Sequence, residues 1–377
     1  MKVDKVSASL FGIPMLLLEL SLGQKFQRGD IGVFRGIYSR AAGIGLTSVF
    51  SAFAIVTYYS VVLAWSMVYF VLSFEPDLKW SEEGSSNDCP NGPASEFFYK
   101  TILRIQDDET CEFKEPGDIS EINGYVYIAV VVTWIIIYFC VFKGVKSSSF
   151  IVWVTVPAPV ILLTILLIRG STLDGAGEGI ELYLTGEEGT DLGDVLSGSQ
   201  IWSDAWGQVF FTLSVCAGVM TSYGSYNPRD KPVILDNFII SLGNSFISFL
   251  SGFTVFSIIG YLRHTNNPVS QEVSTFGLVY IALPTAAAEM PGQNFWNILL
   301  FLTLILLGID SAFSLVEAIS TVLHDTPIGR KINRMIIAAV VCVTCCAISI
   351  VFWTDIGLIL LDVADHYVTT YVMISLG

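Results

Sequence analysis

Long apolar runs recur along the whole chain and alternate with short polar segments. A helix needs about 20 mostly apolar residues to cross the hydrocarbon core of a bilayer. Several runs here reach that length, and most of them contain no Asp, Glu, Lys or Arg. The pattern predicts nine membrane-spanning helices, at residues 6–24, 41–74, 124–142, 147–168, 205–226, 238–262, 295–323, 335–353 and 356–376.

The composition agrees with an all-α polytopic membrane protein embedded in the lipid bilayer. Hydrophobic residues make up 53% of the 377 residues and charged residues only 14%, whereas soluble domains carry about 25% charged residues. A large soluble enzyme is therefore excluded, and no catalytic constellation occurs. The net charge of −15 argues against a nucleic-acid partner, and seven cysteines are too few for a disulfide scaffold.

The charges of the connecting segments alternate along the chain. Residues 25–40 are basic, whereas residues 75–121 hold thirteen acids against four bases, and residues 171–204 hold eight acids and no base. Because cytoplasmic connections carry the excess of Lys and Arg, both acidic loops are predicted to be extracellular. The amino terminus would then start outside, so either a first span is missing or the amino terminus is translocated.

The first acidic loop also contains two cysteines, Cys89 and Cys111. In an oxidising compartment they form a disulfide if their geometry permits it, and they are otherwise two free thiols.

One carboxylate lies deep in an apolar run and needs a reason to be there. Asp310, followed by Ser311, interrupts an otherwise aliphatic stretch of span 295–323. A charge in hydrocarbon is costly, and such residues are functional by default. The pair favours a site for a hard monovalent cation, and the alternative is a buried hydrogen bond that joins two helices.

Span 205–226 carries no charge but is rich in Gly, Ser and Thr through its middle. Such a helix can unwind at the bilayer midplane and offer carbonyls and half-helix ends to ions and substrate; the alternative is close packing of small residues. Gln208 and Thr212 form an i, i+4 pair in this span, and Asn244 and Ser248 form another in the next. These groups suit an ion of either sign, or else ordinary interhelical hydrogen bonds.

Six motifs, in order along almost the whole chain, resemble the neurotransmitter:sodium symporters. They are GIPMLLLELSLGQ (12–24), YYSVVLAW (58–65), KGVKSS (143–148), LIRGSTLDGA (167–176), GQVFFTLS (207–214) and LGIDSAF (307–313). The resemblance implies a leucine-transporter-like bundle of inverted repeats with broken helices. By this comparison the first helix is missing and the chain is truncated at both ends.

The function implied by the resemblance is sodium-coupled, chloride-assisted symport of an amino acid or a related small zwitterion or amine. Transport would proceed by alternating access, in the plasma membrane. The alternatives are a non-transporting receptor or accessory subunit on the same fold, or an inactive truncated product. The particular substrate and the oligomeric state stay open.

The resemblance also implies ion sites for Na⁺ and Cl⁻, with no other cofactor. Thr212 and Asn244 resemble ligands of a first sodium site, and the Leu307 carbonyl with Asp310 and Ser311 resembles half of a second one. The chloride site would comprise Gln208, Thr212, Asn244 and Ser248. Neutral Ser248 leaves the negative charge to a bound anion, which implies chloride dependence, although Asp4 stands where the family's chloride site has a tyrosine.

For the substrate, Tyr59 resembles the family's tyrosine that meets the substrate carboxylate, with an interfacial or core tyrosine as the alternative. Asp365 resembles the acidic half of an outer gate, and Phe211 resembles the aromatic lid above the site. Glu19 and Glu317 are interpreted as braces between helices. The implied substrate-binding residues are Ile55, Tyr59, Phe211, Thr212, Ser214, Ala217, Gly218, Ser311 and Leu315.

Overall fold

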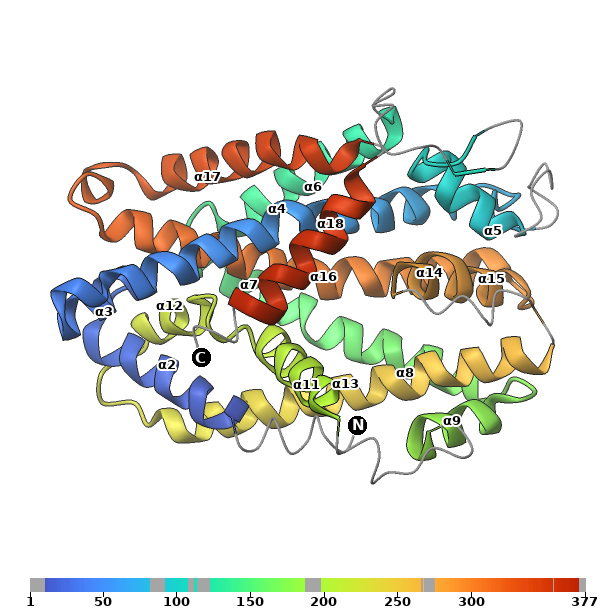
Figure 1. Ribbon diagram of the computed structural model, residues 1–377, viewed down its shortest axis with the longest axis horizontal. Coiled ribbons are helices and arrows are strands. Elements are labelled where there is room, and N and C mark those ends of the chain that lie inside the picture. Colours follow the sequence, from blue (N-terminus) through green and yellow to red (C-terminus); the bar gives the residue numbers. More distant parts are fainter. Residues whose placement is uncertain are drawn as a thin grey trace.

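The protein is an all-helical bundle in its described parts. The computed structural model describes residues 11–81, 92–107, 112–113, 123–186, 198–265, 267, 275–354 and 356–372. Long helices run roughly along the longest axis of the molecule, and shorter helices lie at its ends and across its middle (Figure 1).

Six helices in the described residues are long and apolar enough to cross a membrane. Three of them are α4 (Ala42–Leu72), α13 (Val233–His264) and α16 (Gln293–Asp325). The others are α6 (Gly124–Val141), α7 (Val145–Thr155) continued by α8 (Pro157–Ser171), and α17 (Arg334–Ser349) continued by η7 (Ile350–Trp353). They overlap six of the predicted spans, so the chain carries the helices expected of a multi-pass membrane protein.

The remaining predicted spans correspond to shorter helices. Residues 6–24 overlap α2 (Ile13–Phe26), and residues 356–376 overlap α18 (Gly357–His366) with η8 (Tyr367–Val372). Residues 205–226 overlap two helices, α11 (Ser199–Thr212) and α12 (Val219–Ser225).

The centre of the bundle is the pair α4 and α16, which pack on one another more extensively than any other two helices. Gly308 makes this approach possible, because a methyl group built there would come within 2.3 Å of the Leu63 side chain. Both helices are apolar around most of their circumference, as expected of helices buried on all sides. The outer helices differ, since Trp153 on α7 is 81% exposed and faces the space that lipid fills.

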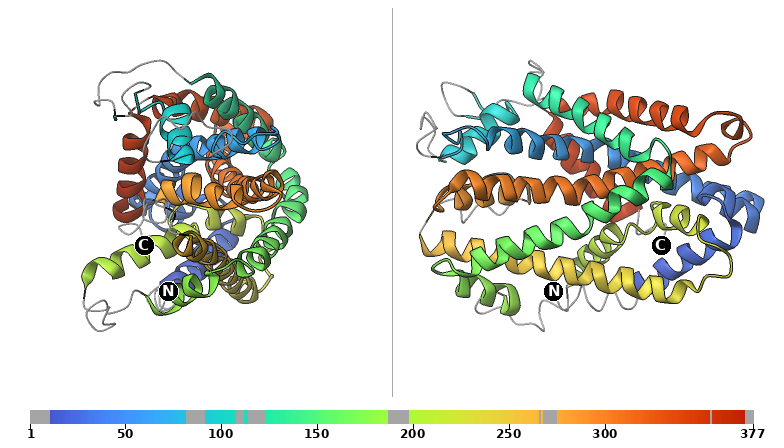
Figure 2. Two further views of the ribbon diagram at one scale, coloured as in Figure 1. Left: turned by 90° about the vertical axis from the view of Figure 1, so that its right-hand side faces the viewer. Right: turned by 180° about the vertical axis from the view of Figure 1, so that it is seen from behind.

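The short helix α12 lies directly on α2, with no room for side chains between them. A methyl group on Gly23 would come within 2.1 Å of the Thr221 carbonyl, and one on Gly224 within 2.5 Å of the Leu20 carbonyl. Behind this pair, α13 runs beside α8 (Figure 2).

An aromatic cluster closes one end of the bundle. It joins α4 to two short elements, η3 (Phe97–Ile102) and η5 (Leu278–Ala282), which follow α5 (Pro93–Glu96) and α14 (Thr275–Gly277). After η5 the chain continues as α15 (Leu283–Ala288), which packs on α16. The Tyr280 hydroxyl donates to the Val62 carbonyl at 2.7 Å, and Tyr69 donates to the Tyr280 carbonyl at 2.9 Å. The ring of Trp65 meets that of Tyr280 edge to face. This end therefore forms a rigid cap, beside which α9 (Ala176–Thr185) packs on α13.

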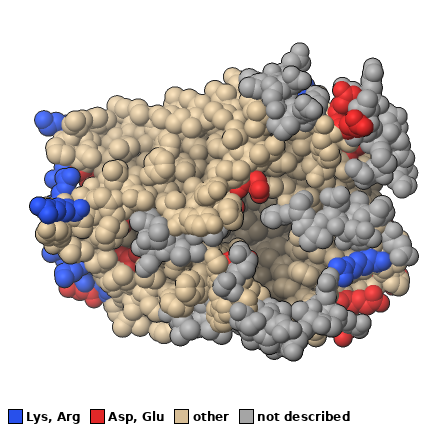
Figure 3. Space-filling model, viewed as in Figure 1, with Lys and Arg blue, Asp and Glu red and all other residues tan. Residues whose placement is uncertain are grey.

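Basic side chains gather at the opposite end. Lys and Arg cluster where α3 (Asp30–Ile37), η2 (Ser39–Ala41) and η6 (Gly329–Lys331) lie, whereas acidic side chains are prominent near the aromatic cap (Figure 3). Arg35, Arg40, Arg330 and Lys331 are all exposed there. This distribution agrees with the predicted orientation, in which the α3 end is cytoplasmic.

Cys89 and Cys111, the candidate disulfide partners, lie outside the described residues, as does Asp4. Within the described part, Cys140, Cys216, Cys342 and Cys345 are buried free thiols, and Cys346 is half-buried and free.

Candidate functional site

The helix predicted to unwind is interrupted. Residues 213–218 separate α11 from α12, and three of them have positive φ angles: 52° at Ser214, 64° at Cys216 and 71° at Gly218. Residues other than glycine rarely adopt such angles, and at Ser214 and Cys216 each costs about 1–3 kcal/mol unless its surroundings enforce it. We call residues 213–218 the break; Ser214 and Val215 donate to the carbonyls of Phe211 and Phe210 and so depart from the regular helical pattern, and such an interruption can present carbonyl groups to a ligand.

Glu19 of α2 holds the break in place. The Cys216 N–H donates to Glu19 Oε1 at 2.5 Å, and the Glu19 side chain is 91% buried, with 9% of it exposed. The break is also tied back to α11, since the Val215 N–H donates to the Phe210 carbonyl at 3.1 Å. These contacts fit the interpretation of Glu19 as a brace.

Tyr59 and Ser311 come together between α4 and α16. The two side chains lie close together. The Tyr59 hydroxyl lies against Gly308, where a methyl group would approach it to 3.2 Å. The tyrosine predicted to bind substrate thus lies beside the segment of α16 that carries the carboxylate predicted to bind sodium, Asp310.

Asp310 is half-buried and has one hydroxyl partner. Thr155 Oγ1, at the end of α7, donates to Asp310 Oδ1 at 2.6 Å. Ser311 beside it is exposed although its neighbour Ala312 is fully buried, so both polar side chains are accessible. The carboxylate retains a second oxygen, Oδ2, with which it can bind a cation.

Sequence reasoning missed Thr155. The sequence holds one signal for it, because Thr155 stands two residues before Pro157. A proline removes a backbone donor and favours a helix start. The structure ends α7 at Thr155 and starts α8 at Pro157.

Thr212 and Asn244 also meet, at the junction of α11 and α13. Asn244 Nδ2 donates to Thr212 Oγ1 at 3.4 Å, which is longer than a typical N–H···O hydrogen bond. Gln208 lies one turn before Thr212 and Ser248 one turn after Asn244, and both are exposed. The structure therefore joins one pair of the four residues predicted to bind chloride and leaves the other two accessible.

The other predicted substrate residues lie on the same elements, but no described contact joins them into one ring. Ile55, Ala217 and Leu315 are buried, whereas Phe211 and Leu307 are half-buried. Ser214 and Gly218 belong to the break, through their positive φ angles.

The acid predicted for the outer gate has a partner that the sequence did not reveal. Tyr58 on α4 donates its hydroxyl to Asp365 Oδ1 at 2.7 Å. Tyr58 precedes Tyr59, so α4 carries two adjacent tyrosines, of which one meets α18 and the other meets α16.

Comparison with known protein families shows the family of the chain. The model of the "Sodium:neurotransmitter symporter family" matches residues 5–376. The chain belongs to this family. The resemblance found in the six motifs is thereby confirmed.

Among similar proteins are a "Sodium- and chloride-dependent GABA transporter 2" of Rattus norvegicus, 34% identical, and a "Creatine transporter" of Torpedo marmorata, also 34% identical. A "Sodium- and chloride-dependent taurine transporter" of Bos taurus is 32% identical. Each comparison covers 94% of this chain. The chain spans about 60% of the length of these relatives, between 60% and 61%.

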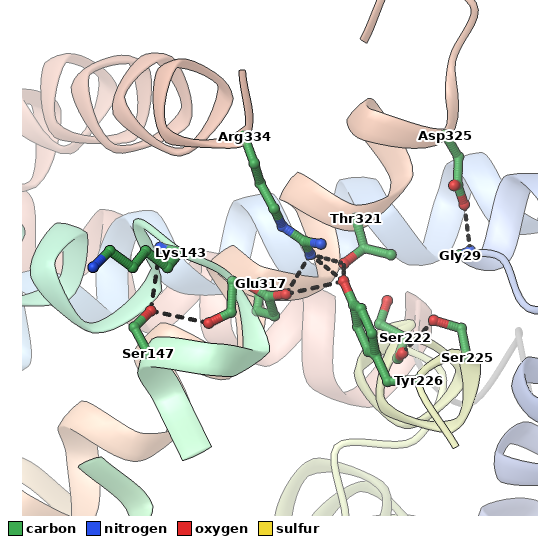
Figure 4. A network of polar contacts seen from close by, with 11 residues as sticks. Gly29, Lys143, Ser147, Ser222, Ser225, Tyr226, Glu317, Thr321, Asp325 and Arg334 are labelled. Carbon is green, nitrogen blue, oxygen red and sulfur yellow. Dashed lines mark hydrogen bonds and ion pairs between the residues drawn. The ribbon is translucent and has the colours of Figure 1, made fainter. Parts of the chain in front are cut away.

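This member of the symporter family has a second polar centre near its basic end. Arg334, the first residue of α17, pairs with Glu317 of α16 at 2.5 Å and donates to Thr321 at 3.1 Å. Arg334 also donates to the Tyr226 hydroxyl, which in turn donates to Glu317 at 3.2 Å (Figure 4). Glu317 is fully buried. Its interpretation as a brace fits these contacts, although its partners could not be predicted from the sequence.

Gly144 is required by this network. Its φ angle is 65°, and a methyl group there would come within 2.6 Å of Arg334 Nε. The connection between α6 and α7 therefore lies directly against the guanidinium, and a side chain at position 144 would push Arg334 away from Glu317.

Proposed function

We propose that this chain contains the transport core of a sodium- and chloride-dependent symporter of the plasma membrane, with the leucine-transporter arrangement of inverted repeats. The cargo is an amino acid or a related small zwitterion or amine, and transport is by alternating access. The observation that carries the proposal is the break between α11 and α12, because an interrupted helix within a bundle supplies backbone groups that ions and zwitterions can bind.

Two sodium sites follow from the polar groups around the break. Thr212 and Asn244, which share a hydrogen bond, would serve the first site. Asp310, Ser311 and the Leu307 carbonyl would serve the second. The half-buried carboxylate of Asp310 supports this assignment, since Thr155 satisfies only one of its oxygens and a hard cation prefers oxygen ligands.

The chloride site is proposed at Gln208, Thr212, Asn244 and Ser248. All four side chains are neutral, so a bound anion would supply negative charge next to the first sodium ion. Coupling between chloride and sodium then follows, because binding one ion strengthens the binding of the other by the same factor.

The substrate is proposed to lie between Tyr59 and the break. The Tyr59 hydroxyl would meet the substrate carboxylate, and the small side chain of Ala217 would leave room beside the substrate. Phe211 and Asp365 would close above the substrate, the latter anchored by Tyr58. The three relatives named above are transporters of taurine, GABA and creatine by name, and we propose a small zwitterion of this kind for this chain.

Uptake of radiolabelled GABA, taurine and creatine tests the proposal. The chain is reconstituted in proteoliposomes, and uptake is measured with Na⁺ or choline outside, and with Cl⁻ or gluconate. Accumulation that requires both Na⁺ and Cl⁻ is expected. Binding without sodium-driven accumulation would support the alternative of a receptor or accessory subunit.

A further inference from the structure

Two acidic side chains, Glu19 of α2 and Asp30 of α3, approach the break from the same side. Glu19 accepts the Cys216 N–H at 2.5 Å. Asp30 lies against Gly218, where a methyl group would come within 2.8 Å of Asp30 Oδ2. The two carboxyl groups therefore contact the middle and the end of the same strained segment.

Both carboxyl groups are buried and incompletely satisfied. Only 9% of Glu19 and 3% of Asp30 is exposed. Asp30 Oδ2 accepts from Ser48 Oγ at 2.5 Å, yet Asp30 Oδ1 and Glu19 Oε2 have no hydrogen-bond partner in the part of the chain that the structure describes. A buried anionic oxygen without a partner is costly, so an ionised state of both groups is strongly disfavoured.

The charged groups around Asp30 disfavour its ionisation further. The nearest titratable groups are Glu19 of α2 and the thiol of Cys216 in the break. The elements α4 and α12 contribute only the hydroxyls of Ser48 and Thr221, and α16 contributes another acid, Asp325, which accepts the Gly29 N–H at 2.7 Å. Among the described residues, no Lys or Arg pairs with Glu19 or Asp30.

The pKa of Asp30, which lies in the connecting helix α3 outside the spans, shifts accordingly. Burial raises it above the ordinary value of 3.8, and the hydrogen bonds from Ser48 and Thr221 oppose the rise. The folded protein thus binds the proton more tightly than the unfolded chain. Stability is therefore lost as the pH rises from the ordinary pKa through the folded one.

We propose that one of the two carboxyl groups, Glu19 or Asp30, stays protonated and that this proton keeps the break in position. Two carboxyl groups that share a buried site retain one proton, because like charges at close range cannot both ionise. Loss of the proton would set two negative charges against Cys216 and Gly218 and displace the backbone proposed to bind substrate. The pair is thus a proton-binding site that goes beyond the ion and substrate sites of the proposed symporter.

Thermal unfolding of the purified full chain in detergent, between pH 6 and pH 9 and in choline buffer, tests this. The variants are Asp30→Asn and Glu19→Gln, which keep a hydrogen-bond acceptor but remove the charge. Relative to the unchanged chain, the Tm of each variant is expected to rise by at least about 2 °C between pH 6 and pH 9. Asp325→Asn is the matched control, since it neutralises a neighbouring acid outside the pair, and its Tm difference is expected to stay constant.

Differences in Tm that are independent of pH for both Asp30→Asn and Glu19→Gln would overturn the proposal. So would a stabilisation by Na⁺ that the unchanged chain shows and both variants lose, because the pair would then hold a metal cation. Unfolding does not depend on transport, so a failure of uptake in all variants would contradict the proposed function and leave this test intact.

Discussion

Asp310 and Glu317 stand seven residues apart on α16, about two helical turns, yet their surroundings are opposite. Glu317 is fully buried, paired with Arg334 and bonded to Tyr226. Asp310 is half-buried, and among the described residues its side chain has one hydrogen-bond partner, Thr155. Arg334 thus compensates the charge of Glu317, whereas the charge of Asp310 remains available to a cation. One helix therefore combines an acid with a structural role and an acid that can bind an ion.

Removing the cation that compensates Glu317 should have the largest effect on stability. Arg334→Ala leaves the buried carboxylate of Glu317 without its cation, which costs about 3–5 kcal/mol. A marked fall of the Tm in detergent is expected, with partial recovery when Glu317→Gln is added to the same chain. An unchanged Tm would show that the guanidinium contributes nothing to the network.

The control for this experiment is an exposed ion pair. Lys231 pairs with Asp236 at 2.5 Å, but the two side chains are 46% and 28% exposed. Exposed pairs contribute about 0–1 kcal/mol, so Lys231→Ala should shift the Tm little, and less than Arg334→Ala.

Removing the open acid should change ion binding rather than stability. Asp310→Ala is expected to weaken the apparent affinity for Na⁺ in uptake by about 10–100-fold, because a charged ligand contributes about 1.5–3 kcal/mol. The Tm without Na⁺ should change much less than in Arg334→Ala. Normal sodium dependence of uptake in this variant would remove Asp310 from the site.

Thr155→Val is the companion variant. It deletes the hydroxyl that donates to Asp310 but keeps the carboxylate. A smaller loss of Na⁺ affinity is expected, since a neutral hydrogen bond contributes about 0.5–1.5 kcal/mol. A loss as large as that of Asp310→Ala would make Thr155 the more important residue.

Supplying a charge where the chain has none should change the dependence on chloride rather than the affinity for Na⁺. Ser248→Glu places a carboxylate at the proposed chloride site, so uptake should need less chloride, with the shift in chloride dependence about tenfold, or 1.4 kcal/mol. Ser245→Glu, three residues earlier on α13, is the control and should leave chloride dependence as it was. Equal behaviour of the two variants would count against the anion site.

The sequence allowed much of the architecture to be predicted. Uncharged runs of sufficient length indicated helices that the structure contains, since apolar length is a local property of the chain. The break was predicted from Gly, Ser and Thr between Gly207 and Tyr226, because small polar residues weaken a helix at their own position. The order of the six motifs along the chain indicated the symporter family.

The partners of the polar residues could not be predicted. Cys216 and Glu19 are 197 residues apart in sequence, and Thr155 and Asp310 are 155 apart. A hydrogen bond between such residues depends on how whole helices pack, which no local pattern encodes. The same holds for Asp30, whose burial follows from the fold of α3 against α4 and α12 and which the sequence shows only as one acid in a basic segment.

The contact of α2 with α12 through Gly23 and Gly224 has a mechanical consequence. Backbone presses on backbone there, so neither helix can rotate or slide without the other. A movement of α12 would therefore carry α2 with it, whereas Gly29, which precedes α3, is hydrogen-bonded to Asp325 at the end of α16. We therefore expect α2 and α12 to move together as one pair of helices.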